Sequence, residues 1–81
     1  MEANAHLDDH SQRAALLSPR ELEILEMTSR GLTNKEVGAR LNLSVHGVKF
    51  HLGSIYRKLG VANRTEASTT YLRELRHEAG P

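Results

Sequence analysis

Hydrophobic residues recur at spacings of three and four along most of the chain, which is the spacing that places side chains on one face of an α-helix. The most regular stripe consists of Val48, Leu52, Ile55 and Leu59. Ser44 precedes this stripe as a side-chain N-cap, and Gly60 follows it as a residue suited to the left-handed end of a helix. The pattern therefore predicts a helix at about 45–59.

Three other helix starts share one local motif, in which a capping side chain is followed three residues later by Glu. The pairs are Ser18 with Glu21, Thr33 with Glu36, and Asn63 with Glu66. The first side chain of such a pair accepts a hydrogen bond from a free backbone N–H, and the Glu bonds back to the amide of the cap. With Gly31 as a stop after the first helix, these starts predict helices at about 19–30, 34–41 and 64–75.

The predicted fold class is all-α, a four-helix (tetrahelical) helix-turn-helix bundle. The 81 residues allow one domain, and with one Phe, two Tyr and no Trp the core must come mostly from Leu, Ile, Val, Ala and Met. Helices 34–41 and 45–59, joined by about three residues, form the helix-turn-helix unit. We expect a flexible N-terminal tail or linker at 1–15, the domain at 16–77 and a C-terminal tail at 78–81.

The composition argues against several classes of protein. Without cysteine there is no disulfide, thiolate zinc site or cysteine nucleophile. No apolar run approaches the ~20 residues that span a bilayer, so we expect a soluble, cytoplasmic protein with no membrane partner. The chain shows no glycine-rich phosphate loop and no serine-centred nucleophile motif, so we expect neither enzyme activity nor a cofactor. His6 and His10, with Asp8 and Asp9 between them, form only a weak metal motif in the expected tail, and we predict no metal site.

Charge is distributed unevenly along the chain. The net charge is only +1, yet the segment 37–65 contains no Asp or Glu. The cations of this segment are Arg40, Lys49, Arg57, Lys58 and Arg64. Such a segment is either an ordinary solvated face or an anion-binding surface, and a helix-turn-helix unit favours DNA as the anion.

The helix at 45–59 carries its polar residues on the face opposite the hydrophobic stripe, at ~100° of rotation per residue. The residues of this face are His46, Lys49, Phe50, Gly53 and Arg57. Periodicity leaves two positions open for Phe50. The ring is either ordinary core covered by another helix, or it is exposed and contacts thymine methyl groups while Lys49 donates to guanine or to a phosphate.

The starts of two helices supply a second kind of contact. Unpaired N–H groups at Thr33, Asn34 and Lys35, and at Ser44 to His46, form positive helix ends that suit phosphate oxygens. Lys35 either adds its charge to such a phosphate site or forms a surface pair with the neighbouring acid.

Four segments of the chain together form the pattern of a known domain. They are Leu17-Ser-Pro-Arg-Glu-Leu-Glu-Ile-Leu, Gly31-Leu-Thr-Asn-Lys-Glu-Val, Lys58-Leu-Gly-Val and Asn63-Arg-Thr-Glu-Ala. Over about 16–76 the chain resembles the LuxR-type (LuxR/NarL/FixJ) helix-turn-helix domain of bacterial quorum and response regulators. The resemblance implies a transcription regulator that binds double-stranded DNA at inverted repeats as a homodimer. It also implies that helix 45–59 enters the major groove, that the fourth helix forms the dimer contact, and that RNA polymerase is a further partner.

Carried over by position, the resemblance implies base contacts for Lys49 and Phe50, and backbone contacts or structural bonds for Lys35, Lys58 and Arg64. For Arg64 the structural alternative is bonding to carbonyls of the preceding turn. The candidate DNA-binding residues are therefore Thr33, Asn34, Lys35, Ser44, His46, Lys49, Phe50, Gly53, Arg57, Lys58 and Arg64.

Three glycines depart from the family pattern. Gly47 stands where Thr is usual and Gly53 at a frequent base-contact position, so contacts made by relatives are expected to be missing there. Gly38 replaces a usual Ala and should loosen its helix, because Gly costs ~1 kcal/mol against Ala in a helix interior. Gly47 and Gly53 favour the alternative function, a protein-interaction module of the same fold that modulates another regulator without reading DNA, whereas the acid-free segment 37–65 favours DNA.

Helical periodicity divides the fourth helix into two sides. We assign Ala67 and Tyr71 to the core, and Thr69, Leu72 and Arg76 to the dimer contact. In the helix at 45–59, His51 lies beside the hydrophobic stripe, so we expect it to be partly buried as a packing or phosphate-bonding group.

Overall fold

The computed structural model describes residues 16–75 of the chain. Its helices are, in order, α2 (Pro19–Ser29), α3 (Asn34–Leu41), α4 (Val45–Leu59) and α5 (Arg64–Thr70), and α5 continues directly into the π-helical stretch η1 (Tyr71–Leu75). The described residues contain no strand, and the predicted all-α, four-helix fold is confirmed. Outside the described residues lie the tails expected at 1–15 and 78–81, Arg76, and the motif of His6, Asp8, Asp9 and His10.

The helix boundaries follow the predicted caps and stripes. Helix α3 has the predicted bounds, α2 ends at Ser29 rather than Arg30, and α4 begins directly after its cap, Ser44. The fourth helix differs in its last part, because Tyr71–Leu75 is π-helical instead of α-helical. The i→i+5 bonding of a π-helix widens the turn, so these residues are rotated relative to a continuous α-helix.

Two of the three predicted capping boxes form in full. At α2, Ser18 Oγ accepts from the Glu21 amide at 3.1 Å, and Glu21 Oε1 accepts from the Ser18 amide at 2.8 Å. Thr33 and Glu36 repeat both bonds at the start of α3. At α5 only half of the box forms, because Glu66 Oε1 accepts from the Ala62 amide instead of the amide of the cap.

Left-handed residues end the helices where the sequence breaks its hydrophobic pattern. Gly31 and Gly60, the predicted stops after α2 and α4, have φ values of 96° and 71°. Asn42 ends α3 with a φ of 60°, a conformation that Asn tolerates better than most residues. These sharp ends keep the connections short, so each helix packs directly against its neighbours.

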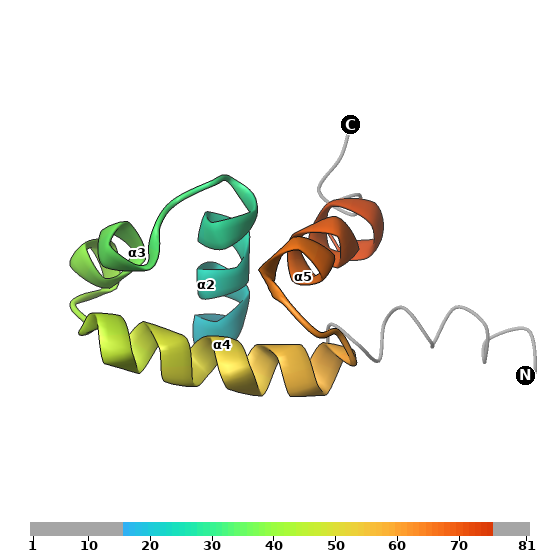
Figure 1. The fold of residues 1–81 in the computed structure, drawn as a ribbon, viewed down its shortest axis with the longest axis horizontal. Helices are drawn as coiled ribbons and strands as arrows, with labels where there is room; N and C mark the ends of the chain where they lie inside the picture. The colour runs from blue at the N-terminus through green and yellow to red at the C-terminus, as the bar shows by residue number, and fades with distance from the viewer. Residues whose placement is uncertain (1–15, 76–81) are drawn as a thin grey trace, which may run out of the picture.

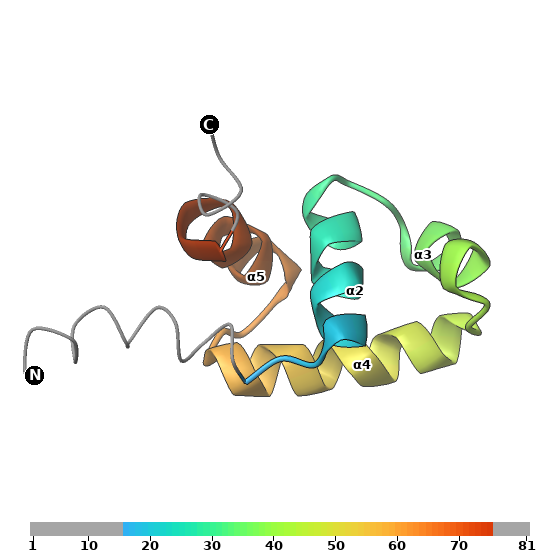
Figure 2. The ribbon, with the colours of Figure 1, turned by 180° about the vertical axis from the view of Figure 1, so that it is seen from behind.

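The core lies between α4 and the other helices. Its buried apolar side chains are Leu17, Ile24, Leu25, Val37, Val48, Leu52, Ile55, Leu59 and Ala67. The predicted α4 stripe is buried along its whole length, with no member more than 5% exposed. In Figure 1 and Figure 2, α4 runs along one edge of the domain and α2, α3 and α5 all lie on the same side of it. The outer side of α4 is therefore free of contact with the other described helices.

Helices α3 and α4 approach each other closely at Gly38. A Cβ built on Gly38 would lie 2.4 Å from the carbonyl oxygen of Leu43, in the turn that joins the two helices. The Leu43 amide donates to the Gly38 carbonyl at 2.8 Å, which holds this turn against α3. The prediction that glycine simply loosens α3 is therefore incomplete, because its missing side chain also lets the turn sit this close.

Candidate nucleic-acid interface

The outer face of α4 combines exposed cations with one exposed aromatic ring. Phe50 is 72% exposed, so the structure excludes the alternative that places its ring in the core. His46, Lys49 and Arg57 are exposed as well, as the periodicity of the helix predicted. The helix sequence contains no Asp or Glu, so nothing within α4 neutralises this face. This face therefore combines positive charge, which attracts anions, with one large exposed apolar side chain.

The exposed Phe50 ring contacts the ring of the next residue. The rings of Phe50 and His51 meet edge to face, with centroids 6.0 Å apart and an interplanar angle of 74°. His51 is half-buried, which agrees with its predicted position beside the stripe. Edge-to-face ring pairs of this geometry are favourable, so the half-buried imidazole gives the exposed ring one aromatic neighbour on the surface of α4.

Gly53 adds no side chain to this same face, and the Arg57 guanidinium lies beside its backbone. A Cβ built there would meet only Arg57 Nη1, at 3.7 Å. Gly47 differs, because its Cβ would lie 3.3 Å from Ser44 Oγ, the atom that caps the helix. The two glycines of α4 therefore have different surroundings: a Cβ at Gly53 would make an ordinary contact with the Arg57 guanidinium, whereas a Cβ at Gly47 would press against the cap.

The starts of α3 and α4 carry the predicted capped ends. Thr33 Oγ1 satisfies the Glu36 amide, and Ser44 Oγ satisfies the Gly47 amide at 2.9 Å. The amides between cap and third helical residue have no intrahelical acceptor in an α-helix, so they point outward as donors. Lys35 is exposed in the first turn of α3 and forms no ion pair with any described residue, so the surface pair left open for it is not seen.

Lys58 is partly exposed, but its ammonium group is bonded to a buried carboxylate of the domain. Its Nζ lies 2.9 Å from Glu21 Oε1 and 3.2 Å from Glu21 Oε2, and Ser54 Oγ donates to the same carboxylate at 2.9 Å. Glu21 is only 5% exposed. Burial alone would raise the pKa of Glu21, but the bonds from the Ser18 amide, Lys58 and Ser54, with the charge of Lys58, lower it from 4.5 to about 2. This buried carboxylate ties the start of α2 to the middle and end of α4.

Arg64 has a similar structural place at the start of α5. Its Nη1 donates to Asn34 Oδ1 at 3.2 Å, and its Nη2 donates to the carbonyls of Thr28 and Leu32. These carbonyls belong to the end of α2 and the connection to α3, not to the turn before α5 that the sequence suggested. One guanidinium thereby joins α2, α3 and α5. It also bonds the side-chain oxygen of Asn34, which is itself a candidate DNA-binding residue.

The remaining exposed cations of the helix-turn-helix unit have no such partners. Lys35, Lys49 and Arg57 form no ion pair within residues 16–75, and the same is true of Arg40 on α3. Sequence reasoning counted Arg40 in the acid-free segment but did not choose it as a candidate. The feature that could have identified Arg40 is the one it shares with the other cations, a positive charge with no acidic residue nearby in the sequence.

The two sides predicted for the fourth helix are confirmed as far as the structure describes them. Ala67 is 1% exposed and Tyr71 packs half-buried against the core. Thr69 is exposed and Leu72 is 46% exposed. Their role in a dimer stays a prediction, as does that of Arg76.

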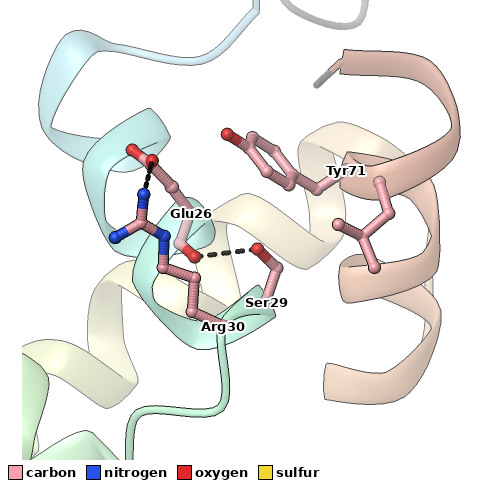
Figure 3. Close-up of a pocket in the computed structure, with 5 residues that line it drawn as sticks. Glu26, Ser29, Arg30 and Tyr71 are labelled. Atoms are coloured by element: carbon pink, nitrogen blue, oxygen red, sulfur yellow. Dashed lines mark hydrogen bonds and ion pairs between the residues drawn. The ribbon is translucent and has the colours of Figure 1, made fainter. Parts of the chain in front are cut away.

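A small hollow of about 220 Å³ lies between the end of α2 and the start of η1. Figure 3 shows Tyr71 facing Glu26, Ser29 and Arg30 across it, with Glu26 and Arg30 paired at 3.1 Å. None of the α4 candidates lines this hollow.

Within residues 16–75, no group of three or more His, Asp or Glu is placed to hold a metal ion. None of the described helices has the length and apolar character that crossing a membrane requires.

Comparison with known proteins gives a consistent result. A family described as bacterial regulatory proteins, luxR family, matches residues 15–70. The chain is 54% identical over 52 residues to the putative HTH-type transcriptional regulator YhjB of Escherichia coli (strain K12), which covers 64% of the chain and 26% of YhjB. It is 48% identical over 62 residues to the transcriptional activator protein CarR of Pectobacterium carotovorum subsp. carotovorum, which covers 76% of the chain and 25% of CarR.

A third relative is the transcriptional regulatory protein LiaR of Bacillus subtilis (strain 168). The chain is 44% identical to it over 63 residues, with 73% of the chain and 30% of LiaR covered. The chain thus spans between 25% and 30% of the length of these three relatives. No solved structure matches the chain.

Proposed function

Since the chain belongs to the luxR family of bacterial regulatory proteins and has the DNA-binding fold with which that family regulates transcription, we propose that it reads a specific double-stranded sequence with α4 in the major groove. The family is one of DNA-binding regulators and not of enzymes. The observation that carries the proposal is the outer face of α4, which is exposed, acid-free and cationic. The positive charge of this face is complementary to the negative charge of DNA, and the major groove is wide enough to admit an α-helix.

The proposed contacts divide into base contacts and phosphate contacts. Lys49 and Phe50 are proposed to touch bases, with His46, Gly53 and Arg57 on the same face close to the groove wall. Thr33, Asn34, Lys35 and Ser44 are proposed to lie against the phosphates, because both helix starts present unpaired amides and Lys35 adds a free charge. These contacts would fix the register of α4 on the duplex.

Lys58 and Arg64 have a different part in the proposal. Both are engaged by acceptors inside the domain, so their first role is to hold α4 and the start of α3 in the orientation that DNA requires. A phosphate contact by either residue would have to share or break these bonds. We therefore treat them as positioning residues.

We further propose that two copies bind an inverted repeat through the exposed side of the fourth helix. Thr69 and Leu72 lie on that side, and Leu72 supplies exposed apolar surface. The surface is small, so the dimer should form on DNA and be weak without it. RNA polymerase as a further partner rests on the family resemblance alone and stays a prediction.

The test is fluorescence anisotropy with a labelled duplex, selected from a randomised pool by the chain itself, across a salt series. Lys49→Ala should weaken binding by ~1–3 kcal/mol, with the slope of log K against log salt unchanged if Lys49 contacts a base as proposed, and reduced by ~0.9 if it contacts a phosphate instead. Arg30→Ala is the matched control: it removes an equal charge that is 68% exposed at the end of α2 farthest from α4 (Figure 1). This control should leave the slope unchanged.

A competing function is favoured by one observation. Gly53 offers no side chain at a position where relatives often touch bases, which suits a module that binds another regulator instead of DNA. If no duplex binds the wild-type chain even at low salt, DNA reading by this chain is wrong and the protein-interaction function takes its place.

A further inference from the structure

The Arg57 guanidinium lies beside Gly53, one turn before the backbone of Arg57 itself. A Cβ built on Gly53 would meet Arg57 Nη1 at 3.7 Å. Residues four apart lie one above the other on a helix, and long side chains lean back over the preceding turn, so Arg57 covers the space that Gly53 leaves empty. Arg57 is exposed and forms no ion pair with any described residue. Its five N–H donors are therefore available to an external acceptor.

Gly53 lies near the centre of the outer face of α4. At ~100° of rotation per residue, Lys49 lies about 40° to one side of Gly53 and Phe50 about 60° to the other. Helices α2, α3 and α5 all lie on the opposite side of α4 (Figure 1 and Figure 2). When such a face enters a groove, the base edges form the floor and the phosphates form the walls. A guanidinium held over Gly53 therefore faces bases rather than phosphates.

We propose that Arg57 reads a guanine in the major groove, from the place where Gly53 has no side chain. This inference rests on the DNA binding proposed above and deepens it. Guanine presents two acceptors, O6 and N7, side by side in the major groove, and the planar fork of a guanidinium donates to both. Adenine and cytosine would present an amino donor to the same fork, and thymine would present one acceptor beside a methyl group. The fork therefore selects guanine.

The missing side chain at Gly53 is what allows Arg57 to make this contact. A methyl group would fit there, because 3.7 Å is an ordinary van der Waals distance. A longer side chain would occupy the space of the guanidinium and push it towards the phosphates. Gly53 is thus a positioning residue for Arg57, and the base contact that Gly53 cannot make itself is made by the next turn of the helix.

Replacing single atoms of the duplex tests this inference. In the duplex selected by the wild-type chain, each guanine is replaced in turn by 7-deazaguanine, which keeps base pairing and O6 but has a C–H group in place of N7. One guanine in each half-site should lose affinity by about twofold to tenfold, the range expected for one of the two bonds of a bidentate contact. Guanines outside the two half-sites should show no penalty.

Variants of the protein assign the sensitive guanine to Arg57. Arg57→Ala should bind the guanine and 7-deazaguanine duplexes equally at that position, with the salt slope unchanged. Lys49→Ala should keep the penalty there, which separates this guanine from any guanine that Lys49 contacts. Arg40→Ala is the matched control, because it removes another exposed cation without an ion-pair partner within residues 16–75, and it should also keep the penalty.

Two variants of Gly53 test its positioning role. Gly53→Ala should keep the 7-deazaguanine penalty, because its methyl group fits beside the guanidinium. Gly53→Leu should abolish the penalty at the same guanine, measured at low salt where nonspecific contacts sustain binding. Ala and Leu are both good helix formers, so α4 should stay folded in both variants, and circular dichroism checks that it does.

The outcomes separate this inference from the proposed function. If the wild type binds its selected duplex specifically but no 7-deazaguanine weakens it, Arg57 reads no guanine and DNA reading stands. The same conclusion follows if Arg57→Ala keeps the penalty, or if it lowers the salt slope by ~0.9 instead, which is the result for a phosphate contact. If the chain selects no duplex at all, the proposed function fails and this inference fails with it.

Discussion

The buried carboxylate of Glu21 gives the most quantitative prediction for this domain. Its pKa of about 2, against an ordinary value of 4.5, means that the folded state favours the charged form. The difference corresponds to ~3 kcal/mol of stability at neutral pH. Since the side chain of its partner Lys58 is 39% exposed, screening by solvent reduces the expected contribution to ~2 kcal/mol.

Glu21→Gln keeps the size of the side chain and removes its charge. We expect the free energy of unfolding to fall by ~2 kcal/mol at pH 7, because the Lys58 ammonium and the Ser54 hydroxyl lose their charged acceptor. Urea unfolding followed by circular dichroism measures this. Glu23→Gln is the matched control: its carboxylate is 56% exposed and lies 4.0 Å from Arg20, so its loss should change stability by less than ~0.5 kcal/mol.

The pH dependence decides whether the charge is the cause. The folded-state pKa of Glu21 lies below its ordinary value, so the stabilisation is complete above about pH 4.5 and is lost as the pH falls towards 2. The wild type and Glu21→Gln should therefore converge in stability between pH 5 and about pH 2. An equal gap between them at pH 7 and at pH 2.5 would show that shape, not charge, makes Glu21 important, and the reasoning would be refuted.

Two further predictions concern the bonds that hold the helix-turn-helix unit in place. In Arg64→Lys, a single ammonium replaces the planar guanidinium that bonds Asn34 and the two carbonyls, so the free energy of unfolding should fall by ~1–3 kcal/mol. Because lysine keeps the positive charge, the salt slope of DNA binding should stay unchanged. Thr33→Ala removes the cap of α3 and should cost ~0.5–2 kcal/mol in thermal or urea unfolding, whereas Thr33→Ser should restore most of it.

The helices were predictable because the signals that define them are local. Ser18, Thr33 and Ser44 each cap a helix within three residues of their own position, and Gly60 ends α4 directly after its last core residue. Such bonds depend little on the rest of the fold. The π-helical end of the fourth helix could not be foreseen in this way, because no local motif in residues 71–75 distinguishes it from an α-helix.

Long-range packing determined what the sequence left open. Periodicity placed Phe50 opposite the core stripe, but its exposure depends on whether another helix covers that side, and the arrangement of α2, α3 and α5 leaves it uncovered. The close approach at Gly38 is of the same kind. A Cβ at this position would collide with the carbonyl oxygen of Leu43, and this collision arises from the path of a turn, which helix propensity does not describe. In both cases the residue type and its spacing could be read from the sequence, but not which parts of the chain lie next to that residue in the folded domain.

The cations show most clearly why charge counting falls short. The acid-free segment contributes five of them to the sequence pattern, yet Lys58 and Arg64 point to acceptors inside the domain. Glu21 lies 37 residues before Lys58, so no local window could pair them. The exposed cations without such partners are Arg40, Lys49 and Arg57, with Lys35 before the segment. If these alone neutralise phosphates, the salt slope per domain should not exceed about 3.6 in magnitude, at ~0.9 for each. A steeper slope that falls by ~0.9 in Lys58→Ala or Arg64→Ala would mean that the substituted residue leaves its internal partner on DNA, and that binding then works against the bonds that position α4.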